Sequence, residues 1–240
     1  MVKSSEIRLS NLEAILFDLD DTLVQTTYFN DQSLAAVAKV LEDRHIELAL
    51  SEQEVRDLIL KVKIQYGTAH WKVFEELEKG LGIHDRKILT ELTLAYDLAE
   101  DNNIRLFPGV TELLKFLIQK GIKTGIITNG DSYRQWKKLI LTGIQDVFDV
   151  VIISEEVGIE KPDPSIYRRA LYSLEVESND AMFVGDKPDT DITGANRAGV
   201  ISIRVRQGRN AKVEPANDDE KPDIDLPSID ILRTYLAVSM

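Results

Sequence analysis

The sequence predicts an α/β fold in which a doubly wound parallel sheet carries an inserted α-helical bundle. Short apolar runs alternate with helical patterns over residues 104–208, which is typical of βαβ units around a parallel sheet. One further apolar run, at residues 14–17, precedes a stretch of roughly eighty residues that shows only helical spacing. We therefore expect a core domain of residues 1–24 and 104–240 and a helical domain of residues 25–103.

The first strand is expected at residues 14–17, where four apolar residues run directly into acidic ones. The residues that follow are Asp18, Leu19, Asp20, Asp21 and Thr22. A strand buried on both faces has this pattern where it reaches the edge of the sheet at its carboxyl end. Ligands of open α/β sheets bind along that edge, so we expect chemistry at these acids.

The helical domain is expected to contain about four helices. Apolar residues recur every three or four positions around residues 34–41, 55–62, 73–81 and 88–95. Ser51 and Glu54 have the spacing of a capping box, which predicts a helix start just after Ser51. These helices form a compact bundle between the first strand and the second.

The α/β alternation resumes after the bundle. Proline, glycine and periodicity signals predict helices at 108–120, 133–141, 165–174, 191–198 and 229–236, and strands at 124–128, 150–153, 181–184 and 201–205. The polar, charged stretch 209–222 is expected to be a loop.

Composition excludes several classes of function. The chain has 41 acidic and 29 basic residues among 240, a net charge of -12, which disfavours nucleic acid and anionic membranes as partners. It has no cysteine, which excludes disulfides and thiolate chemistry. No apolar run approaches the roughly 18 residues of a membrane span, and the N-terminus lacks the apolar core of a signal peptide. We expect a cytoplasmic protein, a monomer or a homodimer, that binds a small molecule.

Histidine chemistry is not expected in the core domain. His45, His70 and His84 all fall within the helical insertion. A Ser-His-Asp triad or a histidine-rich zinc site in the core is therefore disfavoured, and carboxylates, lysine and hydroxyls remain for any reaction there.

Asp18 and Asp20 occupy alternate positions of an extended backbone, so both side chains can lean to the same side. Two such carboxylates repel each other unless a positive charge close to both offsets the repulsion. Oxygen ligands favour a hard cation, so we expect Mg2+. The alternative is an acidic turn in which Asp21 and Thr22 cap a helix.

Thr128 and Asn129 follow the second predicted strand and precede Gly130. A hydroxyl and an amide before a helix start can donate hydrogen bonds to an anion such as phosphate. Alternatively, they cap the helix that begins near Tyr133.

Lys161 lies in the sequence Glu-Lys-Pro-Asp-Pro before the helix at 165–174. A lone lysine is ordinarily a surface residue. The proline-stiffened loop instead favours a role in which Lys161 clamps a phosphate.

Asp186 leaves the strand at 181–184 much as Asp18 leaves the first strand, so these two carboxylates can share one cation. Asp191 opens the next helix, where it is a cap, an anchor or a ligand. Asp189 is expected to be a charge at the helix N-terminus.

Taken in order, these motifs resemble the four signature motifs of the haloacid dehalogenase superfamily. The series runs from Asp18-Leu19-Asp20-Asp21-Thr22 through Thr128 and Lys161 to Gly185-Asp186 with Asp191, and it covers residues 12–208. The resemblance implies a Rossmann-like core, with the helical insertion as the cap of the first subfamily. The chain also resembles archaeal glyceraldehyde 3-phosphate phosphatases within the superfamily, which implies a triose or sugar phosphate as substrate.

The resemblance implies a role for each site residue. Asp18 is the nucleophile that becomes an aspartyl phosphate, and Asp20 is the general acid and base. Thr128 and Lys161 bind the phosphoryl oxygens, together with backbone amides near Asp20 and Asn129. Mg2+ is held by Asp18, Asp186 and the backbone carbonyl of Asp20, and Asp191 supports the metal or orients Lys161.

Other functions remain as alternatives. Family members that displace halide lack an aspartate at the position of Asp20, which argues against a dehalogenase. A phosphomutase needs a second basic pocket, of which the acidic cap shows little sign. A phosphoaccepting receiver-like protein uses similar residue types, but the order of the motifs disfavours it. A catalytically retired member that binds a partner is disfavoured because no acid, threonine or lysine of the set is missing.

Substrate choice is expected to come from the cap. Tyr28 and Phe29 are candidates to line the entrance, although core packing is the expected role of Phe29. Further candidates are Lys61, Lys63, Gln65, Tyr66, Gly67, Thr68, His70 and Trp71. Aromatic residues at helical spacing more often form a bundle core.

Overall fold

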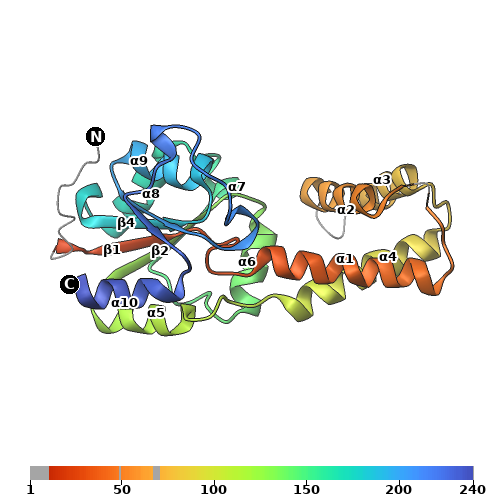
Figure 1. Cartoon of the computed structure of the whole chain (residues 1–240), viewed down its shortest axis with the longest axis horizontal. Helices are drawn as coiled ribbons and strands as arrows, with labels where there is room; N and C mark the ends of the chain where they lie inside the picture. The colour runs from red at the N-terminus through yellow and green to blue at the C-terminus, as the bar shows by residue number, and fades with distance from the viewer. Residues whose placement is uncertain (1–10, 49, 67–70, 240) are drawn as a thin grey trace. The chain divides into compact units, whose positions relative to one another are not determined.

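The computed structural model describes residues 11–48, 50–66 and 71–239 (Figure 1). The chain divides into two compact units. One comprises the chain up to Thr26 together with Arg105 onward, and the other comprises Thr27–Ile104. None of the described helices is both long enough and apolar enough to cross a membrane.

The first unit is built on a parallel sheet, for which the described residues give six strands. These are β1 (Ala14–Phe17), β2 (Lys123–Thr128), β3 (Val150–Ile153), β4 (Ala181–Gly185), β5 (Ile201–Val205) and β6 (Ile224–Leu226). Their spatial order is β3-β2-β1-β4-β5-β6, and every pairing is parallel. The predicted doubly wound sheet is confirmed. The strand order reverses between β1 and β4, and a crevice at the carboxyl ends of such strands is where ligands bind.

Helices cover both faces of this sheet. The first unit contains α5 (Val110–Gln119), α6 (Ser132–Leu141), α7 (Ser154–Val157), α8 (Pro164–Leu174), α9 (Thr193–Ala198) and α10 (Asp230–Ser239). Figure 1 shows α5 and α10 side by side on one face, with α8 and α9 on the other. Coverage of both faces explains why β1 is apolar throughout and fully buried.

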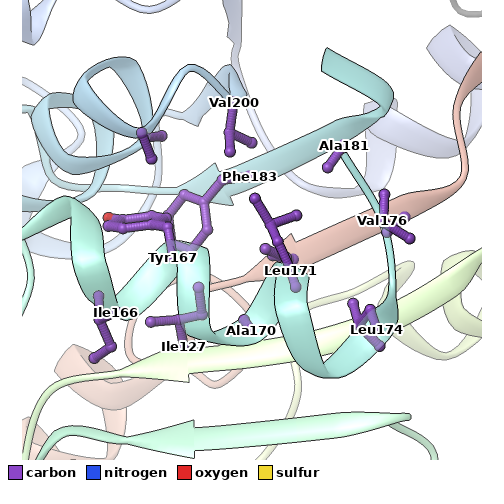
Figure 2. Close-up of a cluster of buried hydrophobic side chains, with 14 of the residues drawn as sticks. Ile127, Ile166, Tyr167, Ala170, Leu171, Leu174, Val176, Ala181, Phe183 and Val200 are labelled. Carbon is purple, nitrogen blue, oxygen red and sulfur yellow. The ribbon is translucent and has the colours of Figure 1, made fainter. Parts of the chain in front are cut away.

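The core between α8 and the sheet fixes the position of α8 (Figure 2). Tyr167 of α8 packs edge-on against Phe183 of β4, with ring centroids 4.9 Å apart. Ile127 of β2 belongs to the same buried cluster. Such buried aromatic pairs are worth about 0.5–1.5 kcal/mol beyond their area. The N-terminus of α8, which follows Lys161, is thereby held against β2 and β4.

Several parts of the first unit differ from the sequence prediction, among them the short helix α7, which was not predicted. The expected helix at 191–198 is a π-helical turn, Pro188–Ile192, followed by α9. The expected loop at 209–222 contains the 3-10 turns Gly208–Asn210 and Asp218–Glu220 and leads into β6. β6 alternates buried, exposed and buried residues, but three residues are too few to establish a period.

The second unit is the expected bundle of helices. It contains α1 (Thr26–Asp43), α2 (Glu52–Tyr66), α3 (Trp71–Leu81) and α4 (Arg86–Asn103), of which α1 begins in the first unit. Its core comprises Val37, Leu41, Ile59, Val62, Leu77, Leu81, Ile83, Leu89, Leu92 and Tyr96. The capping box is present, because the Ser51 amide donates to Glu54 Oε2 (2.8 Å) and the Glu54 amide donates to Ser51 Oγ (3.3 Å).

The structure describes the candidate cap residues only in part. Phe29 is fully buried, which agrees with core packing. Gly67, Thr68 and His70 lie outside the described residues. The role of the helical unit as a cap that selects substrate stays a prediction.

Candidate active site

Asp18 lies where β1 leaves the sheet. Its amide donates to the Val184 carbonyl (2.9 Å), so pairing with β4 continues one residue beyond β1. Its side chain is buried, with 1% of the residue exposed. Oδ1 accepts from Lys161 Nζ (2.5 Å) and Oδ2 accepts from Thr22 Oγ1 (3.3 Å). The strand therefore presents one carboxylate in a fixed orientation at the crevice.

Lys161 reaches this carboxylate from the loop that precedes α8. Asp163 caps α8 by accepting from the Ser165 amide, with Pro164 at the first helical position, and this local pattern fixes the loop. Lys161 Nζ donates to Asp18 Oδ1 and to Asp191 Oδ1 (2.7 Å). Burial lowers the pKa of Lys161, but the charges of Asp18 and Asp191 outweigh this effect and raise that pKa. Lys161 is a buried amine held between two carboxylates that favour its charged form.

Asn129 holds the Lys161 loop through its side chain. Asn129 Nδ2 donates to the Lys161 carbonyl (2.9 Å), and the Lys161 amide donates to Asn129 Oδ1 (2.8 Å). Both polar atoms of this amide are thus used within the protein. The side chain of Asn129 is therefore engaged with the Lys161 loop, and a contact of the Asn129 backbone amide with phosphate stays a prediction.

Thr128 is the last residue of β2 and is 1% exposed. It does not cap α6, because Asp131 accepts from the Arg134 amide and fills that role. Among the residues that the structure describes, Thr128 Oγ1 has no hydrogen-bond partner. A buried hydroxyl without a partner costs about 1–3 kcal/mol, so this oxygen is ready for a ligand.

Asp186 follows β4 and is fully buried. Oδ2 accepts from Asn210 Nδ2 (2.6 Å), while Oδ1 is buried and unpartnered within the described part of the chain. One oxygen of Asp18, Asp186 and Asp191 each lies within 4.8 Å of the others. The carboxylates of Asp18 and Asp186 therefore lie close together, as the sequence predicted.

Asp191 is tied to the turn after β4. Its Oδ2 accepts from the amides of Asp186 (3.1 Å) and Lys187 (3.0 Å), and its Oδ1 accepts from Lys161. A Cβ at Gly185 would lie 2.5 Å from the Asp191 side chain, so only glycine allows this approach. These contacts favour the role of an anchor that orients Lys161 and Asp186.

The electrostatics of the three acids fit a cation. Burial raises the pKa of Asp18, and Asp191 adds to the rise against the charge of Lys161. Burial also raises the pKa of Asp186 well above its ordinary value, and Asp191 and Asp18 act in the same direction. The donors in the cluster are all carboxylate oxygens, and Asp186 Oδ1 has no partner in the residues that the structure describes, which suits Mg2+. A bound divalent cation would relieve the repulsion that raises these pKa values.

Asp20 points to different partners. Its Oδ1 accepts from Lys138 Nζ (2.5 Å) and Thr26 Oγ1 (2.5 Å), and its Oδ2 accepts from Gln135 Nε2 (3.1 Å). Its side chain is therefore outside the acid cluster, and only its backbone carbonyl remains as an expected metal ligand. Burial raises the pKa of Asp20, but the charge and hydrogen bond of Lys138 outweigh this effect and hold that pKa well below its usual range. In this arrangement the charge and hydrogen bond of Lys138 favour the ionised form of Asp20.

Lys138 and Gln135 were missed by the sequence analysis. They lie one helical turn apart on α6, and both are buried. Lys138 Nζ also donates to Gln135 Oε1 (3.2 Å), which closes a ring of hydrogen bonds with Asp20. The sequence feature that could have identified Lys138 is a lysine on the apolar face of the helix that follows β2.

We expect Lys138→Met to destabilise the protein by about 1.5–3 kcal/mol, the usual worth of a hydrogen bond to a charged group. The substitution keeps the length of the side chain but leaves Asp20 without its cation. Urea unfolding of this variant and of Lys115→Met, on the exposed side of α5, measures the difference. Equal stability of the two variants would show that the Lys138–Asp20 pair contributes nothing.

The doubly wound sheet and the cluster of acids and lysine at its carboxyl edge define a Rossmann-like α/β protein with a polar site at the strand ends. A family model for haloacid dehalogenase-like hydrolases matches residues 12–199. The chain belongs to that family.

Relatives with assigned activities cover most of the chain. A glyceraldehyde 3-phosphate phosphatase of Methanopyrus kandleri is 36% identical over 227 residues, 92% of this chain and 97% of the relative. A phosphoserine phosphatase of Thermus thermophilus is 34% identical over 170 residues, 70% of this chain and 65% of the relative. Among solved structures, a HAD phosphatase from Thermococcus onnurineus superposes with a TM-score of 0.62 at 26% identity, over 94% of this chain and 98% of that one.

Proposed function

We propose that the protein is a Mg2+-dependent phosphatase that hydrolyses a small phosphate monoester through a phosphorylated Asp18. The observation that carries this proposal is the meeting, at one buried point, of Asp18, Lys161 and Asp186, whose Oδ1 has no partner among the described residues. Thr128, at the end of the neighbouring strand, adds a hydroxyl that has no partner within the described part of the chain. A dianionic phosphoryl group needs these features, which are a nucleophile, a cation and hydrogen-bond donors.

The first step transfers the phosphoryl group to the enzyme. An Asp18 oxygen forms a bond to phosphorus, and the bond from phosphorus to the ester oxygen breaks. Lys161 and Thr128 hold the phosphoryl oxygens. Asp20 leaves Lys138, whose charge keeps it ionised, takes up a proton from solvent and gives that proton to the departing alkoxide.

The second step returns Asp18 to its starting form. Asp20, now ionised, takes a proton from water, and the water oxygen attacks phosphorus. The bond between phosphorus and Asp18 breaks, and inorganic phosphate leaves. Lys138 keeps Asp20 ionised, so that it can accept this proton.

Asp18, Asp186 and the backbone carbonyl of Asp20 would hold Mg2+, with Asp191 orienting the neighbouring groups. The cation would supply positive charge between the nucleophile and the phosphate, two groups that otherwise repel each other.

The substrate is proposed to be a triose or sugar phosphate. Support comes from the glyceraldehyde 3-phosphate phosphatase relative, which matches this chain over nearly its whole length. The presence of Asp20 favours ester hydrolysis over displacement of halide from carbon. A cytoplasmic location and a monomeric or homodimeric state stay predictions.

The test is release of inorganic phosphate with Mg2+ and with EDTA in its place. The substrates are p-nitrophenyl phosphate, glyceraldehyde 3-phosphate, phosphoserine and several sugar phosphates. We expect Mg2+-dependent turnover, with the preferred metabolite identified by kcat/KM. No turnover of any substrate at any pH would overturn the proposal, and a long-lived phosphoaspartate without turnover would favour the receiver-like alternative.

We expect Asp20→Asn to separate the two steps. An aryl phosphate has a good leaving group and needs little acid help, whereas hydrolysis of the intermediate still needs the base, worth about 10²–10⁴-fold. Stopped-flow assay with p-nitrophenyl phosphate should therefore show a burst of one nitrophenol per enzyme and then slow turnover. Asp189→Asn, an exposed acid in the turn after β4, serves as control and should show no burst. Unchanged steady-state turnover in Asp20→Asn would refute the assignment.

A further inference from the structure

The two oxygens of Asp186 are in different environments. Asn210 Nδ2 donates to Oδ2 at 2.6 Å, whereas Oδ1 is buried and has no partner in the described residues. A carboxylate with one oxygen tied by a short hydrogen bond cannot exchange its oxygens freely by rotation. The contact therefore selects Oδ1 as the oxygen that is available to a ligand.

Asn210 is itself fixed by a buried arginine. It ends the 3-10 turn Gly208–Asn210, and its carbonyl accepts from Arg204 Nη2 (2.9 Å). The same nitrogen donates to the Val213 carbonyl (2.5 Å). Arg204 is fully buried on β5, where it pairs in register with Gly185, the residue before Asp186. One strand pair thus places both Asp186 and the arginine that holds Asn210.

The turn that carries Asn210 is packed against the turn after β1. Gln207 Nε2 donates to the carbonyls of Asp21 (3.1 Å) and Thr22 (2.6 Å). Gly208 has φ of +61°, and a Cβ there would lie 2.4 Å from Asp21 Cγ. This close approach brings the Asn210 segment next to the acids that follow β1.

We propose that Asn210 is a positioning residue that aims Asp186 at the cation. The inference rests on the proposed Mg2+ site and adds to it a residue that lies beyond positions 12–199, where the family model matches. Without Asn210, Asp186 would be free to turn away from Asp18 and Asp191, which repel it. Loss of such a partner of a metal-binding carboxylate typically weakens metal affinity about 10–100-fold.

The experiment measures Mg2+ binding to the full chain by isothermal titration calorimetry, with Mn2+ electron paramagnetic resonance as a second readout. The variants are Asn210→Ala and Asn210→Ser, since serine keeps a polar group at the turn but is too short to reach Asp186. Asn217→Ala is the matched control, because Asn217 lies in the same segment with an exposed side chain. We expect both Asn210 variants to bind Mg2+ about 10–100-fold more weakly and the control to bind as the wild type does.

The outcomes separate this inference from the proposed function. Wild-type protein that binds no metal would overturn the Mg2+ site, and the inference with it. Wild-type protein that binds Mg2+ while a folded Asn210→Ala or Asn210→Ser variant binds equally well would overturn the inference alone. If the alanine variant fails to fold, the serine variant decides. At saturating Mg2+ the folded variants should recover most of their kcat, because the proposed role of Asn210 is to position Asp186 and not to bind substrate.

Discussion

Asp18→Asn should lower kcat for every phosphate ester by about 10⁴-fold or more, the scale on which removal of a nucleophile acts. The amide has nearly the same shape as the carboxylate but cannot form the acyl phosphate. It also lacks the negative charge that faces Lys161 and the cation. Phosphate release at saturating Mg2+ and substrate measures the loss.

Asp189→Asn is the matched control for that substitution. It makes the same chemical change at an exposed acid in the turn after β4, so its activity should stay near that of the wild type. Labelling with ³²P-phosphate ester gives an independent readout, since only protein with Asp18 should carry an acid-stable, base-labile phosphate. Retention of more than a tenth of the activity by Asp18→Asn would contradict the nucleophile assignment.

Lys161→Met should cause the largest loss of stability. Lys161 is 4% exposed and pairs with Asp18 and Asp191, which are 1% and 0% exposed. Removing one member of a buried ion pair typically costs about 3–5 kcal/mol, because the remaining charges are left without a counterion. Urea unfolding in EDTA measures this cost. Activity should fall as well, since the phosphoryl group loses its cationic partner.

Two comparisons establish the cause of that loss. Asp191→Asn in the Lys161→Met background should recover part of the lost stability, because it removes one of the unpaired carboxylates. Added Mg2+ should recover part of it too, since bound cation stabilises the folded state by mass action. A penalty that neither change reduces would show that Lys161 acts through packing and not through charge.

Local patterns predicted most of the fold and the main site positions. The apolar run that becomes β1 can be recognised from the sequence alone, and so can the acid that follows it. Thr128 at the end of β2 and Asp186 after β4 can be recognised from the sequence in the same way. Parallel strands bring their carboxyl ends to one edge, so residues that follow different strands meet there. The order of motifs along the chain was therefore enough to assemble Asp18, Lys161 and Asp186.

The sequence failed where a signal was short or a contact was long-range. β6 has three residues, and the π-helical turn before α9 looks like the start of an ordinary helix. The side chain of Asn129 holds the Lys161 loop, a role that the sequence did not predict. That role depends on a loop 32 residues away, which no local pattern reveals.

The sequence by itself determined the α/β class, the inserted bundle and the acids at the strand ends, because strand burial and chain order are local properties. Only the tertiary structure decided what each charged side chain faces. Asp20 meets Lys138 across 118 residues, and Asp186 meets Asn210 across 24. These contacts set whether a carboxylate is a base, a metal ligand or an anchor, since the pKa and orientation of a buried group depend on its neighbours in space.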